Sequence, residues 1–512
     1  MDSTYKASKE AFVSSTTGST IRHVNMISAV ALASIALHSA LRSRIQSLKS
    51  MPFVVEWLIL VTPLLLSMTV FAEAPGALSM LLLAPTLTLL FVPPLERGSP
   101  LPSRNVDEPT SLTPKTTPTA SLKPVPALTT YRAHMLLMTM LSILAVDFPV
   151  FPRFLAKCET FGVSLMDLGV GSFVFSQGVV SAIPVIKDPS HLRAPLVPKL
   201  TAVTRKMLPI IALGIVRVLL VKGTEYPEHV TEYGTHWNFF ITLAILPIIQ
   251  TLLHPIILRI PIALLAIWLG VLQEFILSVG GLQEIVLNVP RTNTILANKE
   301  GFASLLGYVS IHLLGLSTGT VLLPHTPSYF RKSQDAINEC QRDGARPIPR
   351  FDLHMPRQHA KTVIELFSYS VVWWTLLGLA CLRLDVSRRM ANLPYILWTA
   401  AFNTSFILGY YLLDMFFFPT RTMRIKDPND PSGKRLLVPQ EIQDDQAIGL
   451  LAAINKNGLA LFLLANLATG TINLSIKTMY TSDVRAMMIL GGYALGLCIF
   501  AWMVRRIRLW RF

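Results

Sequence analysis

Charged residues are scarce in this 512-residue chain. Asp, Glu, Lys and Arg together make up 15% of the sequence, whereas a soluble protein usually carries about 25%. Hydrophobic residues make up 52% of the chain, and its mean hydropathy is +0.50. This balance excludes an ordinary soluble enzyme. It predicts a polytopic membrane protein with most of its mass in one bundle.

Cysteine is also scarce, and several familiar catalytic motifs are missing. The four cysteines form no CxxC pair and no metal-ligand spacing, so we expect neither a disulfide framework nor a thiolate metal site. The sequence has no HxxxxD, which soluble-type glycerolipid acyltransferases use, and no GxSxG, P-loop, HExxH or GxGxxG motif. The Gly169-Val170-Gly171 tripeptide lies inside an apolar run and is typical of close helix packing.

Thirteen apolar runs are long enough to cross a membrane, which takes about 20 mostly apolar residues. They predict an all-α polytopic membrane protein with about thirteen transmembrane helices in one bundle, as a single domain over residues 1–512. The first run follows a polar stretch and lacks a cleavage pattern, so we expect a retained span and not a signal peptide. The runs cover residues 24–41, 52–72, 77–95, 129–147, 163–183, 204–221, 238–256, 257–278, 302–322, 363–382, 394–418, 448–470 and 484–504.

Positive charge is distributed unevenly between the two sides of this bundle. The net charge of +15 suggests cytosolic loops rich in Lys and Arg, and not a nucleic-acid partner. With the C-terminus in the cytosol, the cytosolic segments carry 29 Lys and Arg residues and the opposite side carries 13. We therefore predict a lumenal N-terminus and a cytosolic C-terminus. The loop containing Arg388 and Arg389 is the exception to this rule.

The loops on the two sides differ in character. Residues 97–128 are rich in Pro, Ser and Thr and predict a disordered cytosolic tether. Residues 323–361 form a basic cytosolic loop that is either solvated or lies along anionic headgroups. The opposite loops are short and rich in polar residues, as in 147–162, 225–238 and 297–301. This concentration predicts that the chemistry takes place on the lumenal face.

Asp147 and Lys157 are the strongest catalytic candidates. Asp147 ends an apolar run, and Lys157 follows a short turn containing Pro149 and Pro152 that could return it toward Asp147. The aspartate could be a general base, and the lysine could bind a phosphate or a developing oxyanion. The alternatives are a helix-end carboxylate facing headgroups and a lysine that extends to the membrane surface.

Other polar residues interrupt the apolar runs. Asp167 and Asp414 would be costly against lipid, and Arg217 and Lys456 are natural ion-pair partners for them. The Asn455-Lys456-Asn457 triplet suggests a polar cavity for a lipid phosphate or sugar, which Arg217 could help to line beside Asp147. His229 and His236, with their glutamate neighbours, match no strong metal-site spacing, so no metal is predicted.

Several long motifs resemble one family. The segment from Leu144 to Ser176, L-A-V-D-F-P-V-F-P-R-F-L-A-K-C-E-T-F-G-V-S-L-M-D-L-G-V-G-S-F-V-F-S, is similar to the inositol acyltransferases of GPI-anchor synthesis. That family includes PIG-W in animals and the GPI-anchored wall transfer protein in fungi. Four further motifs resemble it in order along the chain: E-Y-G-T-H-W-N-F-F, A-N-K-E-G-F-A-S-L-L-G-Y, N-T-S-F-I-L-G-Y and A-N-L-A-T-G-T-I-N-L-S-I-K-T-M.

The resemblance implies a reaction. Members of the family have thirteen spans in the endoplasmic reticulum and transfer a fatty acyl group, typically palmitoyl, from acyl-CoA to the inositol 2-hydroxyl of glucosaminyl-phosphatidylinositol. The family's catalytic aspartate and lysine match Asp147 and Lys157. The implied partners are acyl-CoA, a glycosylated phosphatidylinositol lipid and the membrane, with no nucleic acid, no metal and no cofactor beyond the co-substrate acyl-CoA. Candidate substrate-binding residues are Asp167, Arg217, His236, Asn238, Asn298, Glu300, Asn403, Asn455, Lys456 and Asn457.

Two other classes of function stay open at this point. A transporter or flippase of lipids or lipid-linked sugars would also place polar groups inside a bundle, but it would consume no acyl-CoA. A purely structural assembly factor would not need Asp147 or Lys157.

Overall fold

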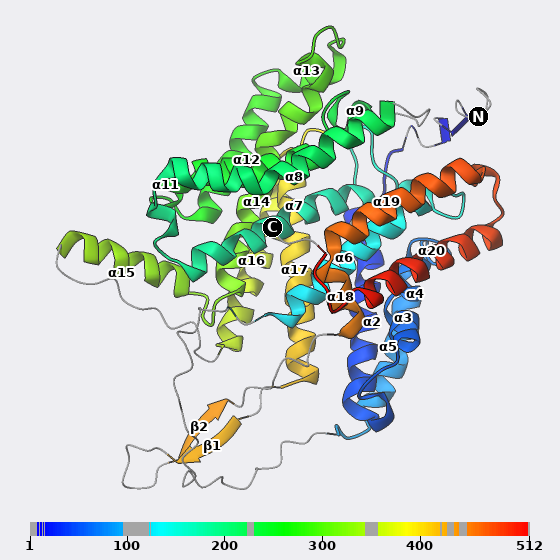
Figure 1. Ribbon diagram of the computed structural model, residues 1–512, viewed down its shortest axis with the longest axis vertical. Coiled ribbons are helices and arrows are strands. Elements are labelled where there is room, and N and C mark those ends of the chain that lie inside the picture. The colour runs from blue at the N-terminus through cyan, green and yellow to red at the C-terminus, as the bar shows by residue number, and fades with distance from the viewer. Residues whose placement is uncertain are drawn as a thin grey trace.

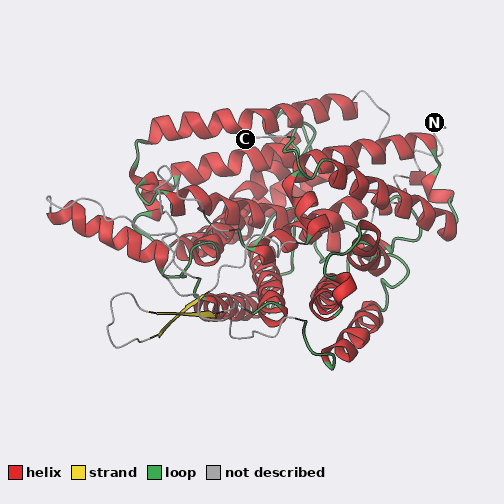
Figure 2. Cartoon of the chain, turned by 60° about the horizontal axis from the view of Figure 1, so that its bottom comes forward, coloured by secondary structure: helices red, strands yellow, loops and turns green. Residues whose placement is uncertain are grey.

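The computed structural model describes residues 8–9, 11–12, 14, 16–95, 122, 124–222, 230–343, 357–419, 422–426, 435–439 and 448–509. Helices make up nearly all of this described chain (Figures 1 and 2). The described strands β1 (Thr422–Lys426) and β2 (Arg435–Pro439) form one antiparallel pair. The prediction of a helical polytopic membrane protein is therefore confirmed. Most of the predicted tether, residues 97–121 and 123, lies outside the described residues.

The first half of the chain runs from the N-terminal helix α2 to the bent pair α12 and α13. Its helices are α2 (Ile21–Arg44), α3 (Phe53–Leu60), α4 (Thr62–Ser67), α5 (Pro75–Leu90), α6 (Pro126–Ala145), α7 (Leu165–Lys187), α8 (Leu196–Lys222), α9 (Val230–Tyr233), α10 (Phe239–Leu252), α11 (His254–Ile257), α12 (Ile262–Ser278) and α13 (Leu282–Asn288).

The second half contains the most deeply buried helix, α14, and ends in a helical hairpin. Its helices are α14 (Lys299–Leu322), α15 (Tyr329–Asp343), α16 (His359–Ala380), α17 (Leu393–Phe417), α18 (Gly449–Lys456), α19 (Gly458–Ser475) and α20 (Asp483–Met503). Short 3-10 turns η1 (Gln46–Leu48), η2 (Arg153–Leu155), η3 (His191–Arg193), η4 (Leu296–Asn298) and η5 (Thr478–Tyr480) lie between helices.

Helices α7 and α14 form the centre of the bundle (Figure 1) and approach each other through glycine. A Cβ atom at Gly178 of α7 would collide with the carbonyl oxygen of His312, and one at Gly315 of α14 would collide with that of Phe175. Gly171 faces Thr399 and Tyr395 of α17 at similarly close range. The packing role predicted for the Gly169–Gly171 tripeptide is therefore confirmed at Gly171. The small residues allow the backbones of α7, α14 and α17 to pack closely against one another.

Each of the thirteen apolar runs coincides with a helix or with two helices separated by a short break. By length and apolarity, seven helices among the described residues qualify as spans, and α12 with α13, bent by 60°, would be an eighth. Three more apolar helical segments are shorter: Phe53–Ser67, Pro75–Leu90 and Phe239–Leu252. The full count of thirteen stays a prediction. The seven qualifying segments are Ile21–Arg44, Leu165–Lys187, Leu296–Leu322, His359–Ala380, Leu393–Phe417, Gly458–Ser475 and Asp483–Met503.

Loops assigned to the same side of the membrane bind one another. On the predicted lumenal side, Ser19 N donates to Val163 O at 2.6 Å, and Gly162 N donates to Val386 O at 2.8 Å. On the predicted cytosolic side, Leu95 N donates to Ser43 O at 3.0 Å. These contacts agree with the division of loops made from the sequence, although they do not say which side is which.

The predicted cytosolic loop 323–361 contains a helix. Residues Tyr329–Asp343 form α15, which packs against the end of α7. Gln334 Nε2 donates to Pro189 O at 2.9 Å, and Arg193 Nη2 donates to Asn338 Oδ1 at 2.6 Å. This segment is therefore not a wholly irregular loop. Residues 344–356 lie outside the described part of the chain.

Candidate active site

The segment after α6 is a tight turn with an apolar interior. Phe148 and Phe151 are fully buried. Arg153 closes the turn by donating from Nη2 to the carbonyl oxygens of Val146 and Phe151, each at 2.8 Å. Burial lowers the pKa of Arg153 to about 10, against the opposing influence of the nearby Asp147 carboxylate. The Asp-Phe-Pro-Val-Phe-Pro sequence thus folds back on itself and fixes Asp147 at the end of α6.

Asp147 is only 2% exposed, and its carboxylate is held by residues from both ends of the chain. Lys9 Nζ lies 3.3 Å from Asp147 Oδ1, and Asn473 Nδ2 donates to Asp147 Oδ2 at 2.8 Å. Lys9 Nζ also donates to Asn473 Oδ1 at 2.9 Å, and Thr478 Oγ1 donates to the same atom at 3.2 Å. Both carboxylate oxygens therefore have a partner, as a buried charge requires.

Lys157 lies in the same loop, but its ion pair is with a different residue. Its Nζ atom donates to both carboxylate oxygens of Glu232, at 2.7 and 2.8 Å. Within the described residues Lys157 forms no hydrogen bond or ion pair with Asp147. The expected return of Lys157 onto Asp147 is therefore wrong as a direct pair. The turn instead directs the lysine toward α9, while Thr16 Oγ1 binds its carbonyl oxygen.

Asp167 anchors the loop that carries Lys157. Its Oδ2 atom accepts from Cys158 N at 2.9 Å and from Ser164 Oγ at 2.8 Å, and its Oδ1 atom lies 2.6 Å from Arg388 Nε. Burial alone would lower the pKa of Arg388, but the carboxylates of Asp167 and Glu232 raise it well above its usual value. Asp167 thus pairs with Arg388. The sequence had suggested Arg217 as a partner, and Arg388 takes that place.

The neighbouring Arg389 binds a second buried carboxylate. Its Nη2 atom donates to Glu300 Oε1 at 2.8 Å, and Arg291 binds both Glu300 oxygens, at 2.5 and 2.9 Å. Arg388 and Arg389 are therefore each paired with a buried carboxylate, that of Asp167 and that of Glu300 respectively.

Two of the family-like motifs dock onto each other beside this cluster. His236 N donates to Asn298 Oδ1 at 2.8 Å, and Thr235 N donates to Ala297 O at 3.0 Å. Gly234 has φ +117°, and a Cβ there would collide with Asn298 and Ala297, so glycine is required at this contact. Asn238 caps α10 by accepting from Phe240 N and Ile241 N. The loops carrying His236, Asn238, Asn298 and Glu300 therefore form one assembly.

The remaining candidate residues lie apart from these loops. Asn403 is buried in α17, where it accepts from Tyr131 Oη at 2.6 Å. Arg217 is exposed on α8. Lys456 Nζ donates to the carbonyl oxygens of Arg505 and Arg506, and Asn457 Nδ2 donates to those of Val504 and Ile507. Lys456 and Asn457 thus cap the end of α20, and neither bonds to the Asp147 group. Asn455, partly exposed, adjoins them in α18.

Comparison with known proteins agrees with this arrangement of motifs. The family model described as GWT1 matches residues 5–504. The chain belongs to the GWT1 family.

Curated relatives of the GWT1 family match over most of the chain. "GPI-anchored wall transfer protein 1" of Aspergillus oryzae is 39% identical over 96% of each chain, and that of Saccharomyces cerevisiae is 34% identical over 96% of each. The protein of the same name from Cryptococcus neoformans var. grubii is 42% identical over 75% of this chain and 63% of its own length.

Sequence reasoning missed four residues that this GWT1 chain places at the site: Lys9, Glu232, Arg388 and Asn473. Lys9 precedes the first span, and Asn473 lies in the last of the family-like motifs, where it was not named as a site residue. Arg388 could have been found, because a positive pair on the wrong side of the charge rule needs a buried partner. Nothing local marks Lys9 as the partner of Asp147.

Proposed function

We propose that this chain transfers a fatty acyl group, palmitoyl in the first instance, from acyl-CoA to the inositol 2-hydroxyl of glucosaminyl-phosphatidylinositol in GPI-anchor biosynthesis. Membership of the GWT1 family supports the reaction class. The observation that carries the assignment to a site is the buried Asp147 carboxylate, fixed by Lys9 and Asn473 at the end of α6. Asp147 and Lys157 are the proposed catalytic residues.

Asp147 is the proposed general base. An inositol hydroxyl is almost fully protonated at neutral pH, so it needs a proton acceptor to attack a thioester. Asp147 takes the proton as the hydroxyl oxygen bonds to the acyl carbon, and the carbon–sulfur bond then breaks. The departing CoA thiolate receives the proton, which restores the carboxylate. A positioned base is worth about 10²- to 10⁴-fold in rate.

Lys157 is the proposed charge-binding group. Its side chain is 33% exposed and its ammonium is held by Glu232, so the group is accessible to a ligand from within its loop. It would stabilise negative charge on the tetrahedral oxyanion or on a donor phosphate. The other candidate substrate-binding residues, Asp167, His236, Asn238, Asn298 and Glu300, support this loop assembly through the contacts described above. Substrate contact by Arg217, Asn403, Asn455, Lys456 and Asn457 remains a prediction.

The decisive test is acyl transfer by purified protein. Wild type, Asp147→Asn and Lys157→Ala are each incubated with radiolabelled palmitoyl-CoA and a glucosaminyl-phosphatidylinositol acceptor. We expect Asp147→Asn to lose at least 100-fold in kcat while the protein still folds and inserts into the membrane, with a lowered unfolding midpoint because Lys9 loses its charged partner. Glu73→Gln, which changes an exposed carboxylate in the α4–α5 loop, is the matched control. Near-normal transfer by Asp147→Asn would remove its role as base. No transfer by wild type would favour the flippase alternative.

The proposed setting is the endoplasmic reticulum membrane, with thirteen spans, a lumenal N-terminus and a cytosolic C-terminus. One domain spans residues 1–512, with cytosolic segments at 97–128 and 323–361. The same-side loop contacts and the charge bias support this topology. A glycosylation tag after Phe512 should remain unmodified in microsomes, and a tag before Met1 should be modified. The opposite pattern would place every loop on the other side of the membrane.

A further inference from the structure

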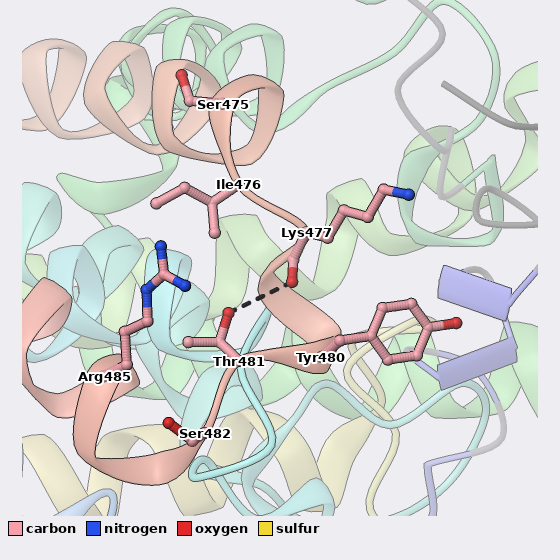
Figure 3. Close-up of a pocket in the computed structure, with 7 residues that line it drawn as sticks. All are labelled: Ser475, Ile476, Lys477, Tyr480, Thr481, Ser482 and Arg485. Atoms are coloured by element: carbon pink, nitrogen blue, oxygen red, sulfur yellow. Dashed lines mark hydrogen bonds between the residues drawn. The ribbon is translucent and has the colours of Figure 1, made fainter.

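The turn between α19 and α20 surrounds a pocket of about 490 Å³ (Figure 3). Ser475 and Ile476, at the end of α19, line one side of this pocket. Thr481, Ser482 and Arg485, at the start of α20, line the other. The pocket therefore lies where two candidate membrane helices meet at a single loop.

Arg485 is the group in this pocket best suited to bind a ligand. Its guanidinium extends from the first turn of α20 toward Ile476 and the end of α19 (Figure 3). Among the described residues it has no hydrogen bond or ion pair. The lining holds hydroxyl groups and the cations Lys477 and Arg485, and no carboxylate. A guanidinium with nearby hydroxyls and no competing acid fits a phosphate group.

The surroundings of the pocket place it at the membrane surface. Leu474 and Val484 flank it with exposed fractions of 77% and 73%, as expected for side chains that face lipid. Tyr480 on the same turn is 67% exposed, and tyrosine is typical of the membrane–water interface. A phosphate that reaches Arg485 would thus be at the depth of lipid headgroups.

The same turn also reaches the proposed base. Asn473, two residues before Ser475, donates to Asp147 Oδ2, and Thr478 Oγ1 binds the Asn473 amide oxygen. In a phosphatidylinositol lipid the phosphate is attached to the ring carbon next to the one that carries the 2-hydroxyl. A phosphate site must therefore adjoin the base that activates this hydroxyl.

We propose that the α19–α20 pocket binds the phosphate ester of a substrate of the acyl transfer, with Arg485 as the main donor. This inference rests on the proposed function. Two substrates carry phosphate esters, the acceptor lipid and acyl-CoA. The interfacial position and the link to Asp147 favour the lipid.

Steady-state kinetics separate the two sources. Arg485→Gln is compared with Arg485→Lys, wild type and Arg383→Gln, which removes an exposed cation from the α16–α17 loop. We expect Arg485→Gln to raise KM for the acceptor lipid about tenfold with kcat changed less than threefold, and Arg485→Lys to recover part of the loss. A rise confined to KM for acyl-CoA would assign the pocket to the donor's phosphates. Unchanged KM for both substrates in a folded variant would overturn the proposal.

A binding experiment keeps this inference separate from the reaction itself. Ser482→Cys, on the wall of the pocket, is made in a background in which the four native cysteines are replaced by serine, with Arg485 either retained or changed to Gln. Maleimide labelling is followed in nanodiscs, and ligand protection is expected only where Arg485 is retained. Phosphatidylinositol or free CoA should slow the labelling more than phosphatidylcholine alone, even with Asp147→Asn present. Equal protection by phosphatidylcholine would mean that Arg485 only faces headgroups, which contradicts a substrate site. If wild type transfers no acyl group, this protection still reports on the pocket.

Discussion

Lys9 Nζ lies 3.3 Å from Asp147 Oδ1, and both side chains are at least 94% buried. The N-terminal segment before the first span therefore contributes the cationic partner of the proposed base. Removing one partner of a buried pair leaves the other charge uncompensated, at a cost of about 3–5 kcal/mol. Breaking the pair is consequently costly, and the contact holds the carboxylate in one orientation.

We expect Lys9→Met to lower kcat for acyl transfer at least tenfold while KM for either substrate changes little. The reason is that the Asp147 carboxylate loses the contact that orients it. The control is Arg22→Met, an exposed cation at the start of α2. Rescue by Lys9→Arg would show that the charge matters. Equal activity of Lys9→Met and Arg22→Met would show that the pair has no catalytic consequence.

The Asn473-Leu474-Ser475 sequon should carry no glycan. Asn473 is 3% exposed, and its amide nitrogen, the atom that glycosylation would modify, donates to Asp147. We therefore expect no change in gel mobility after treatment with a glycosidase or in the Ser475→Ala variant. Asn473→Ala should reduce acyl transfer, whereas Ser475→Ala should not reduce kcat. A glycan at this position is incompatible with the Asp147 contact.

The close approach of α7 and α14 predicts that these helices do not tolerate added side-chain volume. Gly178→Ala should destabilise the protein by about 1–3 kcal/mol, because the new methyl group collides with the backbone of His312. Gly491→Ala adds the same methyl group to α20, where nothing lies within 4 Å. Thermal unfolding in detergent compares the two variants. Similar midpoints would mean that α7 and α14 can separate at little cost.

Asp167 and Arg388 should be energetically coupled. Arg388→Met leaves a buried carboxylate, and Asp167→Asn leaves a buried guanidinium, so each should cost about 3–5 kcal/mol. The double variant should cost clearly less than the sum of the two. The unfolding midpoints of wild type, the two single variants and the double variant complete this double-mutant cycle. Additive effects would mean that the 2.6 Å pair contributes nothing beyond its separate side chains.

Cys158 should resist alkylation despite lying in the catalytic loop. It is buried, and burial together with the adjacent Asp167 carboxylate raises the pKa of its thiol far above the usual value. A raised pKa keeps the thiol protonated, so raising the pH from 7 to 9 should produce little labelling there. The exposed Cys381 should react first. Mass spectrometry of maleimide-treated protein distinguishes the two. Prompt labelling of Cys158 would contradict a buried, protonated thiol.

The helices could be predicted from the sequence, because apolar length and composition are local properties. Each apolar run became helix, and breaks occur near Pro255 and Pro261, where α10, α11 and α12 are separated. The two alternatives for 323–361, a solvated loop or a segment along anionic headgroups, did not include α15, because this helix depends on contacts with Pro189 and Arg193 from another loop. Local pattern carries no information about such contacts.

The sequence grouped the candidate loops but did not reveal their pairing. Lys157, His236 and Asn298 lie in short polar loops that the sequence assigns to one face, and hydrogen bonds join the loops of His236 and Asn298. The partners of Asp147 were not predictable, since Asn473 is separated from it by 326 residues and Lys9 lies before the first span. The same holds for Arg388, 221 residues from Asp167. Electrostatics requires that a buried charge has a partner but does not identify it.

The contacts of Asp147 also constrain the order in which activity can arise during synthesis. Lys9 leaves the ribosome first, Asp147 is inserted with the fourth predicted span, and Asn473 follows the twelfth. A chain that is still being translated therefore holds an incomplete base, with one of its two side-chain partners missing. We expect a chain truncated before Asn473 to hold the Asp147 carboxylate through Lys9 alone, so the end of α19 completes the arrangement on which the proposed chemistry depends.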